Sequence, residues 1–298
     1  RFLFHEFCDT VRRMQKTSED KAFSSIDFVG QCLTDEDRIT AFQKAIKAKV
    51  KQNDTVLDLG TGSGIMALFA ARFGAKKVFA VEFDLFIASL AKKIFQANQS
   101  LNRKFSLLIK DARTISFPKK TKFDVVISEL LTTGMVDEPQ VRAINNLHAK
   151  SLVSSSTRFI PERQDTFISL VRVDYQWFGI NAPMILHLWR WHNWKNLKLQ
   201  IMSKPTLLNS ISFDQINKER FATVLEVMAH QSGAVNALYL TSKSILSKGV
   251  TVEDTEALNA PMLIPLKKAK QVTQNQKVKI KVRYIFGGGY GNFRAEVL

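Results

Sequence analysis

The sequence predicts an α/β domain built on a parallel sheet, followed by a mainly antiparallel β domain. Strand-like and helix-like runs alternate from residue 54 to 130, and the strands are nearly continuous apolar runs, as in parallel sheets covered by helices on both faces. Beyond about residue 161, strand-like runs are separated by polar turns and form no βαβ unit. We therefore expect a helical segment over 1–50, the α/β domain over 51–160 and the β domain over 161–298.

Hydrophobic periodicity predicts the individual elements. A helix beginning near residues 34–36 would carry Phe42 and Ile46 on one face, and a second helix would cover about 85–99. The expected strands are 55–60, 76–82, 105–109 and 123–130 in the first domain, and 165–173, 235–243, 277–286 and 292–298 in the second.

The composition is that of a globular chain. Of 298 residues, 45% are hydrophobic and 23% charged, and glycine and proline are sparse at 13 and 7, which excludes collagenous and disordered classes. No apolar run approaches the roughly 18 residues that cross a bilayer, so no membrane partner is expected. The two cysteines, Cys8 and Cys32, are too few for a disulfide framework, which favours a cytoplasmic protein.

The charge balance is strongly basic, with 43 Lys and Arg against 27 Asp and Glu and a formal net charge of +16. One interpretation is a surface that binds nucleic acid, RNA in particular. The other is that the cations are spread over solvated faces, as in the run from Lys44 to Lys51. No cluster is visible in the linear sequence, which favours the second interpretation.

A glycine cluster follows the first strand. The run VLDLGTGSG places Gly60, Gly62 and Gly64 at alternate positions before a helix that opens at Ile65. Glycines let the backbone turn tightly and approach a ligand where a Cβ would clash. The spacing is G-x-G-x-G and not the G-x-G-x-x-G of dinucleotide-binding proteins. Asp58, at the end of the strand, can accept a hydrogen bond from an ammonium group or a water.

Acidic residues also follow the next two strands. Glu82 ends the second strand, where a carboxylate can accept both hydroxyls of a ribose. Asp111 and Ala112 follow the third strand, where an acidic side chain and a backbone amide commonly face an adenine edge. The ordered set of Asp58, the glycines, Glu82 and Asp111 is more specific than a lone glycine-rich turn.

With these motifs, residues 54–130 resemble the S-adenosylmethionine-dependent methyltransferases of the Rossmann-like class I. The resemblance implies S-adenosyl-L-methionine as cofactor. The residues that it assigns to cofactor binding are Asp58, Gly60, Thr61, Gly62, Gly64, Glu82, Asp111 and Ala112. The other interpretation of the same motifs is a different α/β nucleotide-binding protein.

Two glutamates after the fourth strand indicate the methyl acceptor. Glu129 and Glu138 stand nine residues apart on either side of a short loop, where methyltransferases of bases and glutamine have an Asn-Pro-Pro-Tyr type of turn that this sequence lacks. Carboxylates suit a cation, and a guanidinium presents donors in a planar fork that a carboxylate can meet bidentately. Either glutamate alone is typical of a solvated loop; together, directly after an apolar strand, they favour a site.

This loop is similar to the double-glutamate loop of the protein arginine N-methyltransferases, and its ELLTTGM stretch resembles a divergent branch of that family. The resemblance implies that Glu129 and Glu138 orient the arginine of a protein substrate, with Glu129 also beside the cofactor. Arg38 fills the position of an arginine that contacts the carboxylate of the methionine moiety. The run from Phe159 to Pro161 resembles the link into the family's β-barrel substrate domain.

Two segments depart from the family pattern. The family's Thr-His-Trp segment is replaced by Ala257 to Met262, which contains neither His nor Trp, and Phe23 is the nearest remnant of the N-terminal aromatic motif. Three functions therefore stay open. They are arginine methylation, methylation of another acceptor such as a ribosomal-protein lysine or RNA, and a catalytically silent scaffold that binds the cofactor.

The aromatic stretch over 175–195 contains all four tryptophans. It is typical of barrel core, of a stacking platform for nucleic acid, or of an arm. In the resembling family an insertion here is a dimerisation arm, so the resemblance implies a homodimer. The histidines, His187 and His192 among them, show no metal-ligand spacing, so no metal is expected. The glycines at 287–289 are expected to form a hairpin turn.

Overall fold

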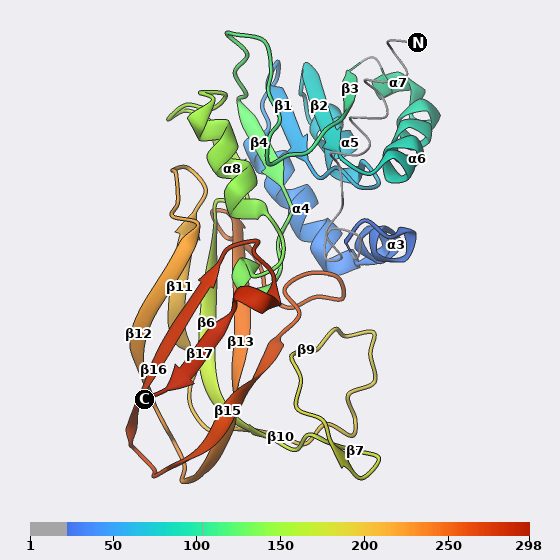
Figure 1. Ribbon diagram of the computed structural model, residues 1–298. Helices are drawn as coiled ribbons and strands as arrows, with labels where there is room; N and C mark the ends of the chain where they lie inside the picture. The colour runs from blue at the N-terminus through green and yellow to red at the C-terminus, as the bar shows by residue number, and fades with distance from the viewer. Residues whose placement is uncertain (1–22, 103) are drawn as a thin grey trace, which may run out of the picture.

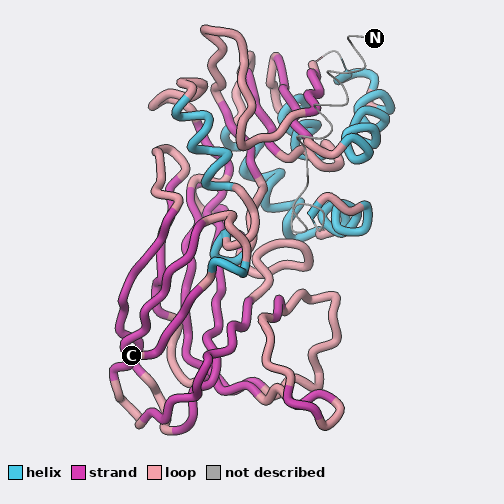
Figure 2. Tube along the Cα trace, viewed as in Figure 1, coloured by secondary structure: helices cyan, strands magenta, loops and turns pink. Residues whose placement is uncertain are grey.

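The computed structural model describes residues 23–102 and 104–298, which form an α/β half above a β half (Figure 1). The part of the predicted helical segment before residue 23, with Cys8, lies outside the described residues. Helices occur almost only in the α/β half, and the β half is built from long strands and turns (Figure 2).

The α/β half contains a parallel sheet of order β3-β2-β1-β4-β5. Its strands are β1 (Thr55–Leu59), β2 (Lys77–Glu82), β3 (Phe105–Ile109), β4 (Val125–Ser128) and β5 (Arg158–Ile160). The strand order reverses between β1 and β4, and ligands of α/β proteins bind in the crevice at such a reversal, beyond the carboxyl ends of the strands.

Side-chain caps fix where the main helices begin. The Asp35 carboxylate accepts the Arg38 N–H at 3.0 Å and caps α4, and Asp84 accepts the N–H groups of Phe86 and Ile87 at 2.9 and 3.0 Å and caps α6. The two predicted helices are confirmed, although α6 ends at Ala97. The helices are α3 (Ile26–Thr34), α4 (Glu36–Lys49), α5 (Ile65–Arg72), α6 (Leu85–Ala97), α7 (Gln99–Asn102) and α8 (Gln140–Ala149).

The β half contains a sheet of order β10-β6-β13-β15-β9, with β11 beside β6 and β14 beside β13, and a second sheet of order β12-β16-β17. Every pairing between its described strands is antiparallel, as predicted. Its elements are β6 (Arg163–Val173), β7 (Gln176–Trp177), β8 (Ile180–Asn181), β9 (Leu186–His187), β10 (Leu199–Ile201), β11 (Thr206–Ser212), β12 (Arg220–Met228), β13 (Gly233–Ser247), β14 (Val250–Val252), β15 (Met262–Val272), β16 (Lys277–Ile285), the 3-10 turn η2 (Tyr290–Asn292) and β17 (Arg294–Val297).

The two halves share one hydrophobic core. Helix α4 packs against α5 and also against β13 and β14, and its Phe42 and Ile46 are fully buried. The buried cluster that contains them continues through Leu240 of β13 to Phe286 at the end of β16. Because packed cores resist deformation, this continuity fixes the β half relative to the carboxyl ends of β1 and β4.

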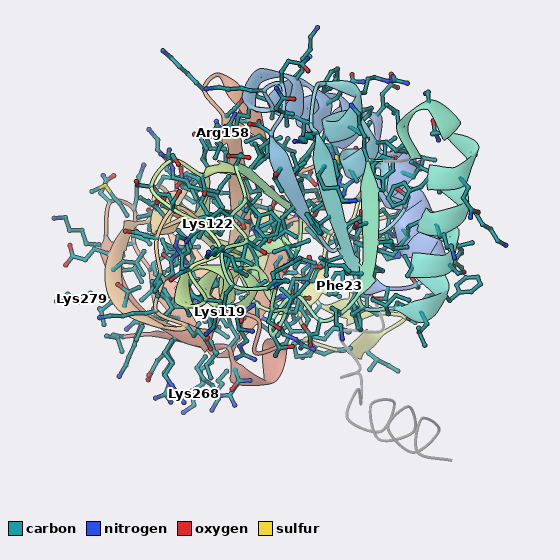
Figure 3. The ribbon with its side chains drawn as sticks, turned by 90° about the horizontal axis from the view of Figure 1, so that it is seen from above. Phe23, Lys119, Lys122, Arg158, Lys268 and Lys279 are labelled. Atoms are coloured by element: carbon teal, nitrogen blue, oxygen red, sulfur yellow. The ribbon has the colours of Figure 1, made fainter. Side chains whose placement is uncertain are left out.

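Figure 3 shows the side chains of the molecule from above. Phe23 lies near the middle of this view, whereas Lys268 and Lys279 lie on the margin of the β half. None of the described helices is long and apolar enough to span a bilayer.

Candidate active site

A pocket opens at the carboxyl ends of β1, β2 and β4, where Phe23 and Phe28 of the N-terminal segment form part of its wall. Ten of the eleven residues that the motifs single out line this pocket. They are Arg38, Asp58, Gly60, Thr61, Gly62, Glu82, Asp111, Ala112, Glu129 and Glu138. Because these residues are spread over a hundred positions, it is the fold that brings them together.

The turn after β1 adopts a conformation that favours glycine. Gly60, Gly62 and Gly64 have φ values of +69°, +53° and +84°, in the left-handed region. A Cβ on Gly60 would lie 2.4 Å from the Leu130 side chain. The atom nearest to a Cβ on Gly62 would be in Val29, at 3.8 Å. Gly64 is not among the residues that line the pocket. A Cβ there would lie 2.5 Å from the Phe95 ring of α6, so this position leaves no room for a larger residue.

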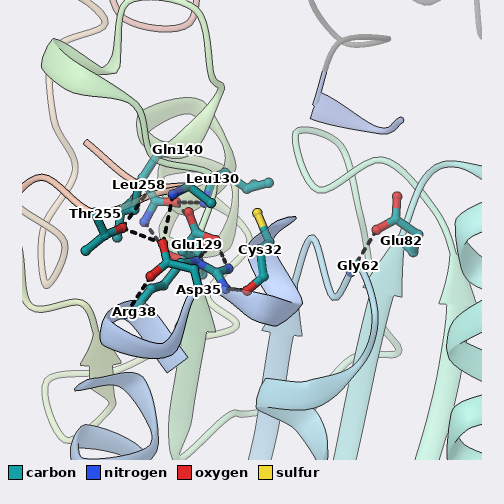
Figure 4. Close-up of polar contacts among 12 residues, drawn as sticks. Cys32, Asp35, Arg38, Gly62, Glu82, Glu129, Leu130, Gln140, Thr255 and Leu258 are labelled. Carbon is teal, nitrogen blue, oxygen red and sulfur yellow. Dashed lines mark hydrogen bonds and ion pairs between the residues drawn. The ribbon is translucent and has the colours of Figure 1, made fainter. Parts of the chain in front are cut away.

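Glu82 is bonded to this glycine turn. Its Oε2 accepts the Gly62 N–H at 3.0 Å, and its Oε1 accepts the N–H groups of Phe83 and Asp84 at 2.9 and 3.0 Å (Figure 4). Burial raises the pKa of Glu82, and the three backbone N–H groups oppose that rise. The carboxylate is therefore held in one position at the pocket wall.

Asp58, in β1, is almost completely buried. Its Oδ2 accepts the Thr61 hydroxyl at 2.6 Å, and only 2% of the residue is exposed. Burial raises the pKa of Asp58 to about 7, although the Thr61 hydrogen bond lowers it. A cationic group of a ligand placed beside Asp58 would favour its charged form.

Asp111 and Ala112 form the wall beyond β3. The Asp111 carboxylate forms an ion pair with Arg113 at 2.8 Å and keeps 29% of its side chain exposed, whereas Ala112 is buried. This carboxylate is thus engaged by a neighbour in the chain, a feature that the motif alone did not indicate.

A buried ion pair joins α4 to the end of β4. Arg38 Nε donates to Glu129 Oε2 at 3.1 Å and Nη2 bonds the same oxygen, while Nη1 donates to the Cys32 carbonyl at 2.7 Å (Figure 4). Burial raises the pKa of Glu129, and Arg38 opposes that rise. Burial also raises the pKa of the Cys32 thiol to about 12, so the thiol stays protonated. Each buried charge of the pair is therefore compensated by the other.

Gln140 fixes the backbone on both sides of Glu129. Its side-chain oxygen accepts the Ser128 hydroxyl at 2.9 Å and the Leu130 N–H at 3.1 Å, and its Nε2 donates to the Ser128 carbonyl at 3.1 Å. Gln140 is fully buried. No sequence pattern indicates this residue, because a glutamine at the start of a helix is not distinctive.

Residues 129–138, here called the carboxylate loop, contain the 3-10 turn η1 (Thr133–Met135) and are held by the β half. Gly134 N–H donates to the Ser242 hydroxyl at 3.0 Å, and the Gly134 carbonyl accepts the Tyr284 hydroxyl at 3.0 Å. The N–H groups of Gly287 and Gly289 donate to the carbonyls of Met135 and Val136, both at 2.9 Å. The turn predicted at 287–289 thus exists and also supports the loop.

A hydrogen-bonded row connects the carboxylate loop to the aromatic stretch. The Tyr290 hydroxyl bonds the Asp137 carboxylate and lies 2.5 Å from His187 Nε2. Since the single hydroxyl hydrogen of Tyr290 goes to Asp137, the neutral imidazole of His187 carries its hydrogen on Nε2 and donates it to Tyr290. Burial lowers the pKa of His187 and so favours the neutral imidazole. The spacing of His187 and Trp189 predicted a packed residue but not this contact, because Asp137 and Tyr290 are 50 and 103 positions away from His187.

The segment that replaces Thr-His-Trp lies against the start of α4. Asp35 Oδ2 accepts the Thr255 hydroxyl at 2.6 Å and the Ala257 N–H at 2.8 Å. Asn259 is fully buried and bonds Gln164 at 3.0 Å. The segment therefore contacts the helix that carries Arg38 even though it has neither His nor Trp.

The aromatic stretch divides into a core part and an outer part. Tyr175 is buried, as the core interpretation expects, whereas Phe178 is completely exposed on the hairpin of β7 and β8. Trp189 and Trp191 are stacked at 4.6 Å, and the Phe28 ring meets them edge-on at 5.8 and 6.4 Å. The outer part thus contacts a wall residue of the pocket within the same chain.

No group of three His, Cys, Asp or Glu side chains within residues 23–102 and 104–298 is arranged to hold a metal ion.

Comparisons with known proteins agree with this geometry. The family model of the ribosomal protein L11 methyltransferase (PrmA) matches residues 39–165. The chain is 32% identical over 256 residues to protein MJ1452 of Methanocaldococcus jannaschii, covering 86% of this chain and 91% of that one. It is 28% identical over 182 residues to the histone-arginine methyltransferase CARMER of Drosophila persimilis, covering 56% of this chain and 33% of that protein.

Among solved structures, the PRMT1 enzyme–prozyme heterotetrameric complex of Trypanosoma brucei with AdoHcy superposes with a TM-score of 0.71 at 16% identity, covering 93% of this chain and 98% of that one. The fold and the pocket thus define a class I methyltransferase that uses S-adenosylmethionine and has the two-part architecture of the protein arginine methyltransferases. The chain belongs to the family of MJ1452, a divergent, arginine methyltransferase-like group.

Proposed function

We propose that this methyltransferase transfers the methyl group to a guanidinium nitrogen of an arginine side chain in a protein. The observation that supports this proposal is that Glu129 and Glu138 line the same pocket as the glycine turn of the cofactor motif. Two carboxylates in the lining of one pocket, one of them directly after a buried strand, match a planar cation better than a neutral amide or a base.

The residues at the pocket fit the cofactor by their chemistry. Glu82 offers carboxylate oxygens to ribose hydroxyls, Asp58 offers an acceptor to the ammonium group, and Arg38 offers a cation to the carboxylate of the methionine moiety. Asp111 and Ala112 would border the adenine. When bound, S-adenosylmethionine supplies an electrophilic methyl group on a sulfonium ion, so the protein need not activate the donor.

The protein's main task is then to align the acceptor nitrogen. Arg38 bonds only one oxygen of Glu129, Oε2, and Gln140 fixes the backbone around it. With Glu138 at the other end of the carboxylate loop, the guanidinium would be held in one orientation, and alignment of this kind supplies most of the acceleration in such transfers. The raised pKa of Glu129 suits it to accept the proton that the methylated nitrogen releases.

A second candidate function is methylation of another acceptor, such as a ribosomal-protein lysine or RNA. It is favoured by the match to the family model described as a ribosomal protein L11 methyltransferase. That match ends at residue 165, so it covers the half that carries the cofactor motif and only the first residues of β6. The match therefore supports the methyl donor more directly than it supports this acceptor.

The test is to incubate the protein with methyl-labelled S-adenosylmethionine and a Gly-Arg-rich peptide, and to locate the label by mass spectrometry. Glu129→Gln and Glu138→Gln should each reduce methyl-arginine formation by about 100-fold or more. The isosteric control Glu226→Gln, on the exposed face of β12, should be fully active. If the protein binds the cofactor and labels lysine or RNA but forms no methyl-arginine, the second function replaces the proposal. If it binds the cofactor and labels no acceptor, the silent scaffold is favoured.

We also propose that the chain forms a homodimer through the aromatic stretch. Phe178, Ile180 and Met184 expose 101%, 68% and 58% of their surface on or next to the hairpin of β7 and β8, and an exposed apolar group of this kind marks an interaction site. Sedimentation equilibrium should give twice the chain mass, and Phe178→Ser should shift it toward the monomer. A monomeric wild-type protein would contradict this proposal.

A further inference from the structure

The second sheet of the β half carries a row of cations on its outer face. Along β16 the buried positions are apolar or aromatic, and the exposed positions between them are Lys277, Lys279, Lys281 and Arg283. Because successive side chains of a strand point to opposite faces, all four cations project from one face. The net charge of +16 is therefore partly gathered into a row, contrary to the interpretation that the cations are only dispersed.

A groove runs beside this row, between β15 and the edge strand β17. Its cations are Lys267 and Lys268 from β15, Lys281 and Arg283 from β16, and Arg294 from β17. Glu296 is the one acidic residue in the lining formed by the described residues. Five cations thus face one groove with one carboxylate among them.

The cations of β16 are only partly balanced within the sheet, where Lys279 lies opposite Glu226 and Lys281 lies opposite Glu296. The strand register places Arg283 directly opposite Arg294, and like charges at opposed positions destabilise a sheet. Within the described part of the chain, no carboxylate lies within 4.0 Å of a cation of Lys267, Lys268 or Arg283. A ligand of opposite charge would remove this repulsion.

The spacing and the side-chain types select the class of ligand. Cations on one face of a strand are about 7 Å apart, so the row suits a chain of successive anions more than a single small anion. The two arginines offer planar forks that bind phosphate bidentately. The described lining contains no aromatic side chain on which a base would stack, so recognition would be of the backbone and independent of base sequence.

We propose that this groove binds the sugar–phosphate backbone of a single-stranded nucleic acid. The groove lies away from the active site, since Lys268 and Lys279 mark the margin of the β half and Phe23 marks the pocket (Figure 3). A basic substrate peptide is repelled by this groove, so its occupant differs from the methyl acceptor proposed above. The inference goes beyond the proposed function and stands without it.

The experiment measures fluorescence anisotropy of a labelled 20-nucleotide single-stranded RNA of mixed sequence with the full chain, between 50 and 300 mM salt. For single strands the logarithm of the binding constant falls with the logarithm of salt by about 0.7 per phosphate contact. K281Q/R283Q/R294Q removes up to three contacts, so the slope should become shallower by about 2 and the affinity at 0.1 M salt should fall roughly 100-fold. K267Q/K268Q should have a smaller effect in the same direction.

The matched control is K92Q/K93Q/K119Q, which removes the same charge from exposed positions of the α/β half. It should change RNA affinity by less than about twofold. Circular dichroism and cofactor affinity show that each variant is folded. Equal losses in both triple variants would overturn the proposal in favour of net charge alone, and an unchanged groove variant would overturn it outright. Equally tight binding of a 20-residue polyglutamate would show that an acidic protein is the occupant instead.

Discussion

Replacement of Asp58 by asparagine tests the electrostatics of the pocket. The substitution removes the ionisable group but keeps an oxygen that can accept the Thr61 hydroxyl, which lies 2.6 Å from Oδ2. Burial raises the pKa of Asp58 from 3.8 to about 7 in the folded protein. Between these two values the folded state keeps a proton that the unfolded state has released, so the stability falls as the pH rises. Above pH 7 both states are ionised and the cost is constant.

The magnitude follows from the shift in pKa. One pKa unit corresponds to about 1.4 kcal/mol, so the destabilisation that the raised pKa of Asp58 causes reaches about 4 kcal/mol at pH 8 but only about 1.7 kcal/mol at pH 5. Asp58→Asn carries neither cost. The free energy of unfolding of Asp58→Asn minus that of wild type should therefore be roughly 2 to 3 kcal/mol larger at pH 8 than at pH 5.

The assay is urea denaturation of both proteins without cofactor at the two pH values. Because the prediction concerns the difference between the proteins, the titration of all other groups cancels. Asp214→Asn, at an exposed position, is the control and should show no comparable increase. A constant difference between Asp58→Asn and wild type at both pH values would refute the reasoning that burial raises this pKa. The same variant should bind S-adenosylmethionine more weakly, measured by calorimetry.

Three further substitutions test the packing around the site. Gly64→Ala should lower the free energy of unfolding by about 3 kcal/mol, since its Cβ would lie 2.5 Å from the Phe95 ring. Gly249 has a similar φ in open space, so Gly249→Ala should lower the free energy of unfolding by only about 1 kcal/mol. Equal losses in urea denaturation would contradict the steric argument. Gln140→Met should reduce kcat about tenfold with little change in the KM for cofactor, because the amide that holds the end of β4 is lost. An unchanged kcat would mean that packing alone holds the carboxylate loop. Tyr290→Phe removes the hydroxyl between Asp137 and His187 and should also lower kcat while leaving cofactor affinity unchanged. A parallel loss of cofactor affinity would show that the hydrogen bonds among Asp137, Tyr290 and His187 support the whole pocket.

Much of the architecture could be predicted because it is encoded locally. Strands β6, β13, β16 and β17 appear where the alternation of apolar and polar residues places them, and helix α4 begins where Asp35 can cap it. The alternation follows from the strand geometry, in which one face is buried and the other is solvated.

The helix and strand ends differed only slightly from prediction. The helix expected over 85–99 ends at Ala97, and the strand expected over 123–130 is restricted to Val125–Ser128. In the second case the chain leaves the sheet just before Glu129, where the backbone N–H of Leu130 bonds Gln140 instead of a strand. A side chain twelve positions after Ser128 thus decides where the strand ends, and local propensity does not include it.

The two domain types, the glycine turn and the acidic residues that follow the strands could be predicted from the amino-acid sequence, because each depends on local backbone geometry or on the periodicity of burial. What these groups touch depends on the tertiary structure. It paired Arg38 with Glu129 across 91 positions, set Tyr290 between Asp137 and His187, and rested the carboxylate loop on Gly287 and Gly289. It also placed the cations of β15, β16 and β17 around one groove. Contacts of this kind arise from the packing of distant segments onto a shared core, and no local pattern in the chain records them.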